Sequence, residues 1–171
     1  MPRLETDKLL LLPMSFEMLE ARCESALALE QILGCAVSDS FPLADTLRLF
    51  HGALGATVND KKRTGDWGSY ILTDRQRVVG LAGFKGLPST GDVELFYELI
   101  PEARGQGLAT QAALELSGWA LKNGASLVTA KIEASNADSR RVLERCGFQT
   151  MSDQQIDVQW YALTSRAAAQ P

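Results

Sequence analysis

The stretch that most restricts the fold of this chain is a glycine-rich turn between a strand and a helix. Residues 93–100 have strand character and end at a proline, and Arg104-Gly105-Gln106-Gly107-Leu108-Ala109 follows. Apolar residues then recur at helical spacing over 108–122. A strand that enters a helix through glycines gathers unpaired backbone N–H groups at the positive end of the helix dipole. The turn therefore predicts an anion site, which Gly105 and Gly107 leave open to a diphosphate.

Along the rest of the chain, segments with the alternating pattern of a strand are interspersed with segments that have apolar residues at helical spacing. Strands are predicted over residues 9–12, 67–72, 78–84, 93–100, 127–132 and 156–163, and helices over 15–33, 43–58, 108–122 and 138–145. This order predicts a single α+β domain over residues 1–171, with its core over 4–163 and a disordered tail over 166–171. We expect a central mixed, mostly antiparallel sheet of about six or seven strands, flanked by about four helices.

Composition excludes several classes of protein. The chain has 171 residues, 46% of them hydrophobic, and a formal net charge of −4. A negative chain without clustered Lys and Arg does not suit nucleic acid. No segment approaches the roughly 20 apolar residues that span a bilayer, and the N-terminus lacks a secretory signal pattern. We therefore expect a cytoplasmic protein that binds neither nucleic acid nor membrane.

Cysteine and histidine usage narrows the chemistry further. Cys23, Cys35 and Cys146 are an odd number without close spacing, so neither a disulfide framework nor a zinc site is predicted. His51 is the single histidine, which removes most Ser-His-Asp, Cys-His and multi-histidine metal sites. No metal is expected.

Two common nucleotide-binding signatures use a glycine-rich turn of this kind, and neither matches. No Gly-Lys-Ser/Thr follows, so the turn is not a Walker loop. A dinucleotide fingerprint would need a third spaced glycine and repeated βαβ units. The pattern Arg104-x-x-Gly107-x-Ala109 instead resembles the pyrophosphate-binding signature of the GNAT superfamily of N-acetyltransferases.

A second motif carries the same resemblance. Asn136-Ala137-Asp138-Ser139, closed by Gly147-Phe148, is similar to the Asn-x-x-Ser…Gly-Phe segment of the RimJ/RimL-type branch, which includes ribosomal-protein N-terminal acetyltransferases. The opening residues 4–9 and the strand pattern Glu94-x-x-Tyr97-Glu98-Leu99 also resemble that branch. The resemblance covers residues 4–163 and implies a single GNAT-like domain.

The resemblance implies acetyl-CoA as co-substrate and a primary amine as acceptor, either a protein N-terminus or a small molecule. It implies direct transfer in a ternary complex, and a homodimer is compatible with it. In the superfamily the strand before the turn splays from its neighbour through a bulge and offers backbone N–H groups. The residues that match cofactor-binding positions are Leu99, Ile100, Arg104, Gly105, Gln106, Gly107, Leu108, Ala109, Thr110 and Asn136.

Two catalytic residues follow from the same comparison. Glu94 matches a general-base glutamate and would remove a proton from the ammonium, directly or through water, with Glu98 as its neighbouring alternative. Many members carry a tyrosine acid seven residues after the Asn, where this chain has Leu143. Ser139 is the nearest replacement donor toward the leaving thiolate.

Other interpretations stay open at this point. The glycine turn also fits a tight connection, Asn136 a simple helix cap, and Ser139 a first-turn residue. Because Leu143 replaces the tyrosine, an acyl-CoA-binding or regulatory module without catalysis is the alternative function. Turnover of acetyl-CoA with any amine separates the two. The acceptor, the oligomeric state and the acyl length are not determined by the sequence.

Overall fold

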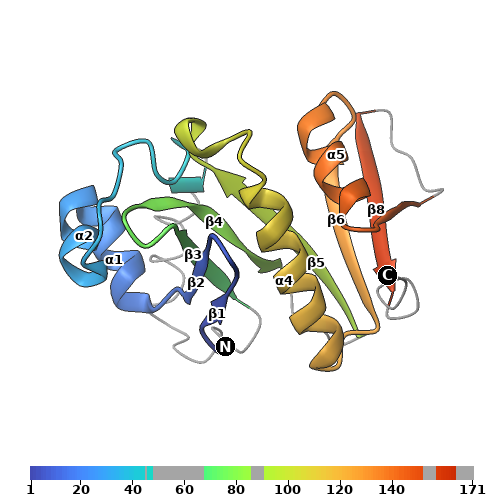
Figure 1. Cartoon of the computed structure of the whole chain (residues 1–171), viewed down its shortest axis with the longest axis horizontal. Helices are drawn as coiled ribbons and strands as arrows, with labels where there is room; N and C mark the ends of the chain where they lie inside the picture. The colour runs from blue at the N-terminus through green and yellow to red at the C-terminus, as the bar shows by residue number, and fades with distance from the viewer. Residues whose placement is uncertain (45, 48–67, 86–90, 152–156, 165–171) are drawn as a thin grey trace.

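The fold is described by a computed structural model over residues 1–44, 46–47, 68–85, 91–151 and 157–164 (Figure 1). Several sequence predictions lie outside these ranges, including Trp67, His51 and the tail over 166–171. Of the helix predicted over 43–58, only Ala44, Thr46 and Leu47 are described as helical.

The described residues form one eight-stranded sheet, in the order β1-β2-β3-β4-β5-β6-β8-β7. Every neighbouring pair is antiparallel except β5 and β6. The predicted mixed, mostly antiparallel α+β fold is therefore confirmed. The number of strands exceeds the expected six or seven because β1 and β7 have two residues each. Two residues are too few to show the alternating apolar pattern by which a strand is recognised in a sequence. The strands are β1 (Leu4–Glu5), β2 (Leu10–Pro13), β3 (Ser69–Thr73), β4 (Val78–Lys85), β5 (Asp92–Leu99), β6 (Leu127–Glu133), β7 (Gln149–Thr150) and β8 (Val158–Thr164).

The prediction of one helix over 15–33 is wrong, because Ser25 divides it. The described helices are α1 (Phe16–Glu24), α2 (Ala26–Leu33), α4 (Leu108–Lys122) and α5 (Ala137–Arg145), with a 3-10 turn η1 (Pro101–Ala103). Ser25 is extended, its N–H donates to the Ala21 carbonyl, and its hydroxyl accepts from the Ala28 N–H. A serine that caps the following helix with its own side chain ends the preceding one. Ser15 is the N-cap of α1, and Gly34, in a left-handed conformation, ends α2.

Helix α4 packs across the middle of the sheet, and α5 packs against β6 and α4 (Figure 1). The face of α4 toward the sheet is the predicted one, with Leu108, Ala112 and Leu116 buried. Behind them, the Trp119 and Phe84 rings lie 6.1 Å apart between centroids. Burying this apolar stripe fixes where α4 begins relative to the end of β5.

The two parallel strands separate part-way along their length. β5 pairs with β6 only from Asp92–Leu127 to Leu95–Ala130. β6 continues with β8 as far as Glu133, while β5 continues with β4 as far as Leu99. Figure 1 shows the strands adjacent at one end and apart at the other, where α5 begins. The expected splay from a neighbouring strand is therefore present, between β5 and β6, and the β4–β5 ladder runs from Gly80 to Lys85 without a bulge.

We predict that Gly80→Ala destabilises the protein by about 1–3 kcal/mol, as overpacking of a closely packed site does. A Cβ at Gly80 would lie 2.2 Å from the Glu98 carbonyl oxygen, so β4 and β5 would have to move apart. Urea unfolding monitored by circular dichroism measures the change.

The matched control is Gly118→Ala, inside α4, where a Cβ would meet nothing within 4 Å. This variant should gain about 0.5–1 kcal/mol, because alanine favours a helix interior. Equal stability of the two variants would contradict close contact between β4 and β5.

Candidate active site

The glycine-rich turn adopts a conformation that only glycine accommodates easily. Gly105 has a φ of 74° and Gly107 a φ of 76°, both left-handed. A Cβ at either position would meet nothing within 4 Å, so the positive φ, and not a lack of space, is what favours glycine. The space above the turn is open. The turn therefore brings the chain from η1 directly into α4.

The first turn of α4 presents backbone donors toward that open space. Gly107 is the N-cap and no side chain caps the helix. The first amide hydrogen bond to the cap is from the Gln111 N–H to the Gly107 carbonyl, at 3.1 Å. The earlier N–H groups, of Leu108, Ala109 and Thr110, have no partner within the helix and point beyond its end. With the helix dipole, they suit a phosphate.

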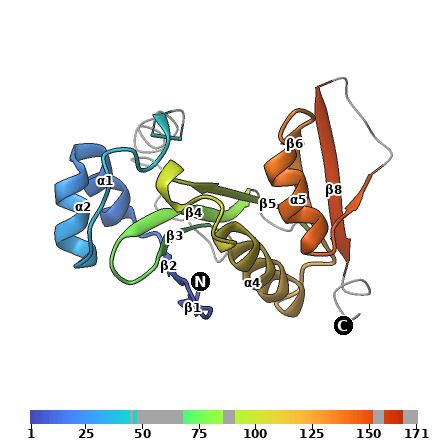
Figure 2. The same ribbon diagram turned by 45° about the horizontal axis from the view of Figure 1, so that its top comes forward.

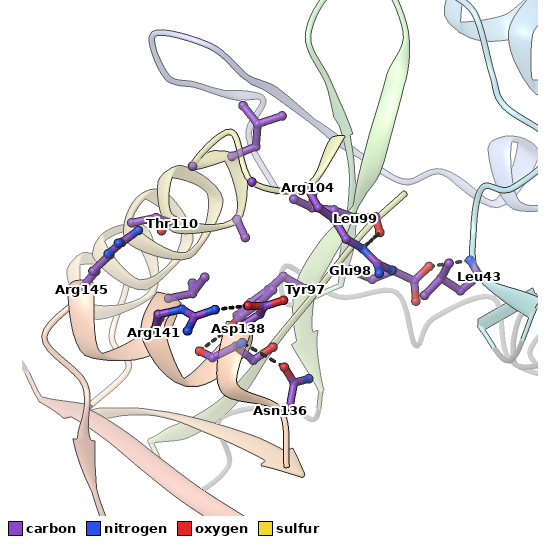
Figure 3. Close-up of a pocket in the computed structure, with 16 residues that line it drawn as sticks. Leu43, Tyr97, Glu98, Leu99, Arg104, Thr110, Asn136, Asp138, Arg141 and Arg145 are labelled. Atoms are coloured by element: carbon purple, nitrogen blue, oxygen red, sulfur yellow. Dashed lines mark hydrogen bonds and ion pairs between the residues drawn. The ribbon is translucent and has the colours of Figure 1, made fainter. Parts of the chain in front are cut away.

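A pocket of about 500 Å³ lies between this turn, β5 and α5 (Figure 3). Nine of the predicted site residues line it: Leu99, Arg104, Gly105, Gly107, Leu108, Ala109, Thr110, Asn136 and Ser139. Three others do not: Glu94, Ile100 and Gln106. The pocket also holds residues to which the sequence assigned no role, among them Leu43, Tyr97, Asp138, Arg141 and Arg145.

The edge of β5 toward the opening carries backbone donors. The Ile100 N–H donates to the Val79 carbonyl at 3.0 Å, so it is used on the β4 side. N–H groups alternate in direction along a strand, so those of Tyr97 and Leu99 point the other way, toward β6. Because β6 pairs no further than Leu95, these two donors face the pocket. Of the two predicted positions, Leu99 therefore directs its N–H toward the pocket, whereas the Ile100 N–H is used within the sheet.

Arg104 and Gln106 fold back onto the chain before the turn. The Arg104 Nε donates to the Leu99 carbonyl at 3.2 Å, and the Gln106 Nε2 donates to the Glu102 carbonyl at 3.1 Å. Arg104 therefore joins the turn to the exposed edge of β5. Gln106 faces away from the pocket.

Asn136 and Ser139 form the start of α5. The Asn136 Oδ1 accepts from the Ser139 N–H at 3.0 Å, so the expected helix cap is present. The cap uses only the side-chain oxygen and leaves the amide NH₂ group at the pocket. The Ser139 carbonyl accepts from the Tyr97 hydroxyl at 3.1 Å, which joins α5 to β5 across the opening.

Tyr97 lines the pocket, and the sequence reasoning gave it no role. Burial raises its pKa to about 12, with the Ser139 hydrogen bond acting in the opposite direction. The phenol is therefore a stable donor at neutral pH. Its alternation with Leu99 on the strand was the available signal, but its contact with α5 depends on the tertiary fold.

The two strand carboxylates have different surroundings. The Glu98 Oε1 accepts from the Leu43 N–H at 2.8 Å, and its Oε2 accepts from the Thr46 hydroxyl (Figure 3). Glu94 forms an ion pair with the Lys85 Nζ at 2.8 Å. With no bulge in the ladder, both lie on the same face of β5, opposite Tyr97 and Leu99.

Comparison with known proteins decides the family. The Acetyltransferase (GNAT) domain matches residues 9–149. The chain belongs to the GNAT family of acetyltransferases. A relative, YjdG of Bacillus subtilis (strain 168), named an uncharacterized N-acetyltransferase, is 28% identical over 149 residues, which cover 85% of this chain and 88% of YjdG.

Two solved structures show the same fold. One is the microcin C7 self-immunity acetyltransferase MccE in complex with acetyl-CoA and AMP, with 17% identity, a TM-score of 0.62, and 93% of each chain covered. The other is the ribosomal L7/L12 alpha-N-protein acetyltransferase RimL in complex with coenzyme A, with 16% identity, a TM-score of 0.64, and 95% and 97% covered. At these identities the similarity concerns the fold of the acetyltransferase.

The remaining reactive groups of this acetyltransferase do not suggest a covalent carrier. Burial raises the pKa of Cys146 to about 12 and also raises the pKa of Cys23 and Cys35, so thiolates are disfavoured. Within the described ranges, no group of three or more His, Cys, Asp or Glu side chains is placed to hold a metal ion. The same ranges contain no helix that is both long and apolar enough to cross a membrane.

We predict that alkaline pH destabilises the wild type more than Tyr97→Phe. The pKa of Tyr97 is about 12 in the folded protein, and an unfolded tyrosine has a pKa of about 10. Folded protein thus holds an extra proton between these values, and the free energy of unfolding falls as pH rises through that window, by up to about 2–3 kcal/mol. Urea unfolding of both proteins from pH 9 to 12 measures the difference. Parallel curves would contradict a buried Tyr97 phenol, since Cys146 titrates in both proteins.

Proposed function

We propose that this enzyme moves an acetyl group from acetyl-CoA to a primary amine by direct transfer. One observation carries the proposal: the unpaired N–H groups of the glycine turn and those of the β5 edge face the same pocket. A diphosphate and a pantetheine amide chain would meet both sets of donors at once. The co-substrate supplies the activated acetyl thioester, and the protein supplies binding, orientation and proton transfer.

The phosphate end of the pocket is the start of α4. Gly105, Gln106, Gly107, Leu108, Ala109 and Thr110 provide the backbone on which the diphosphate would rest, where the helix dipole favours negative charge. Arg104, bonded to the Leu99 carbonyl, fixes the turn against β5. From the other wall, the NH₂ group of Asn136 would donate a hydrogen bond to a carbonyl oxygen of the pantetheine chain.

The reacting end lies where β5 and β6 separate. The Leu99 and Tyr97 N–H groups, held in the sheet before substrate arrives, can stabilise negative charge on the acetyl carbonyl oxygen. Ser139 provides a hydroxyl at this end of the pocket for the leaving thiolate. The Tyr97 phenol does not ionise near neutral pH, so it stays a hydrogen-bond donor at this end of the pocket.

The incoming amine must lose a proton, because an α-amino group has a pKa of about 7.7–8.0 and a lysine a pKa of about 10.4. We assign that role to Glu94, acting through water, since Glu94 does not itself line the pocket. Glu98 does line it, but both of its oxygens accept hydrogen bonds from residues 43–46, which suits positioning.

The acceptor class is a primary amine on a protein N-terminus or a small molecule. The Asn136–Ser139 motif and the fold shared with RimL support a RimJ/RimL-type enzyme, and RimL is an alpha-N-protein acetyltransferase. A cytoplasmic location is part of the same proposal, and it agrees with Cys23, Cys35 and Cys146 being free thiols.

We predict that acetyl-CoA, but not NAD or ATP, raises the melting temperature by about 5–10 °C at 100-fold excess over Kd. Gly107→Val should abolish this shift, because a β-branched residue disfavours the left-handed angle and fills the space above the turn. Thermal unfolding with each ligand measures the effect.

Gly124→Val is the matched control at the opposite end of α4. Gly124 also has a positive φ, of 104°, with nothing within 4 Å of a Cβ. This variant should lose stability in the same way and keep the acetyl-CoA shift. A shift that survives in Gly107→Val would overturn the proposed cofactor site.

We predict that Glu94→Gln lowers kcat by about 10²–10⁴-fold, the usual contribution of a positioned base. Part of the rate should return at high pH, where the amine deprotonates in solution. CoA release with a panel of amines, including peptides with free N-termini, measures the rate. Glu98→Gln is the parallel variant, and a loss confined to it would transfer the base role to Glu98. A Glu94→Gln loss that persists at high pH would make Glu94 a binding residue.

A further inference from the structure

The pocket ends at Tyr97 on the side where β5 and β6 come together. The two strands are paired only from Asp92 to Leu95 of β5, and they separate beyond that point. On β5 the pocket wall consists of Tyr97, Glu98 and Leu99, and it does not include Leu95. Tyr97 is therefore the residue of β5 that closes the pocket toward the junction of the two strands.

The Tyr97 side chain is fixed at both of its ends. Its backbone is paired with Ala82 in the ladder between β4 and β5. Its side chain lies on the same face of β5 as Leu95 and Leu99, because alternate residues of a strand share a face. From there the ring reaches the start of α5, where its hydroxyl donates to the Ser139 carbonyl at 3.1 Å (Figure 3). The ring thus spans the gap that the departing β6 leaves between β5 and α5.

The space behind the ring is lined largely by apolar groups. Leu95 and Ala130 are the last pair of the β5–β6 ladder, and both are buried. Cys146 and Tyr161 also lie near the phenol, since each adds to the rise in the pKa of Tyr97 that burial causes. None of these four neighbours lines the pocket. The ring therefore separates the pocket from an interior that would favour methylene groups.

We propose that Tyr97 restricts the transferred acyl group to acetyl, because its ring occupies the space that a longer acyl chain would enter. The inference rests on the proposed acetyl-CoA site, in which the Tyr97 and Leu99 N–H groups face the acyl carbonyl oxygen. With the carbonyl held there, the coenzyme extends past Leu99 toward the glycine turn, and the acyl chain points the other way, toward the ring. A methyl group fits in front of the ring, but a ring fixed at both ends cannot move aside for further methylenes.

Isothermal titration calorimetry with acetyl-CoA and butyryl-CoA tests the inference without an acceptor amine. Wild type should bind acetyl-CoA about 10-fold or more tightly than butyryl-CoA, as the cost of overpacking implies. Tyr97→Ala should bind butyryl-CoA at least as tightly as acetyl-CoA, with a gain of up to about 10-fold from burying two more methylenes. Tyr97→Leu should shift the preference in the same direction, and it carries the test if Tyr97→Ala does not fold.

Two control variants separate the bulk of the ring from other effects. Tyr97→Phe removes only the hydroxyl and should keep the preference for acetyl-CoA. Tyr70→Ala also removes a buried tyrosine ring, but Tyr70 lies on β3 and outside the pocket wall, so this variant should keep the preference too.

Three results would each overturn the role of Tyr97: equal affinities in wild type, a preference that survives in Tyr97→Ala or Tyr97→Leu, and a preference lost to the same extent in either control. A wild type that binds neither compound would instead overturn the acetyl-CoA proposal itself, so the two failures are distinguishable.

Discussion

The unequal pairing of β5 is the constraint on which the rest of the site depends. β5 is paired with β4 from Glu94 to Leu99, but with β6 only from Asp92 to Leu95. A parallel pair requires a crossover, and α4 supplies it, so the chain must turn sharply at the end of β5. Gly105 and Gly107 make that turn possible. The separated strand edge and the uncapped helix end thus arise together, from one connection, and their donors necessarily face the same space.

Much of the fold followed from local signals. Helix α4 has the predicted bounds, 108–122, because its apolar stripe, its glycine start and its Asn123-Gly124 end agree. The sequence failed at Ser25, where apolar residues on both sides continue a helical period but a serine caps each segment. It also failed for β1 and β7, which exist because a neighbouring strand pairs with them and not because of their own pattern.

The candidate site also has parts that the sequence could predict and parts that only the tertiary fold creates. The turn, Asn136 and Ser139 were predictable, since each combines a local backbone requirement with a motif. The hydrogen bond between Tyr97 and Ser139, the contact of Glu98 with Leu43, and the position of Arg145 near Thr110 join segments far apart in sequence. The periodicity of apolar residues along one sequence cannot reveal contacts between residues so far apart in the chain. The replacement of the usual tyrosine by Leu143 therefore suggested a missing phenol, while the fold places the phenol of Tyr97 at the same pocket from another strand.

The side of the pocket formed by Leu43 and Glu98 depends on a part of the chain remote from both motifs. Arg22 of α1 is buried, and its guanidinium donates to the Phe41 and Asp39 carbonyls. Burial lowers the pKa of Arg22, and the nearby Asp39 opposes that shift, so the group stays a cation. This anchor fixes the segment whose Leu43 N–H binds Glu98. Residues between 97 and 145 thus supply the pocket lining apart from Leu43, whose segment meets β5 at Glu98. Because the two parts of the lining come from separate segments, a substitution near Leu43 can change the shape of the pocket at Glu98 and leave the glycine turn intact.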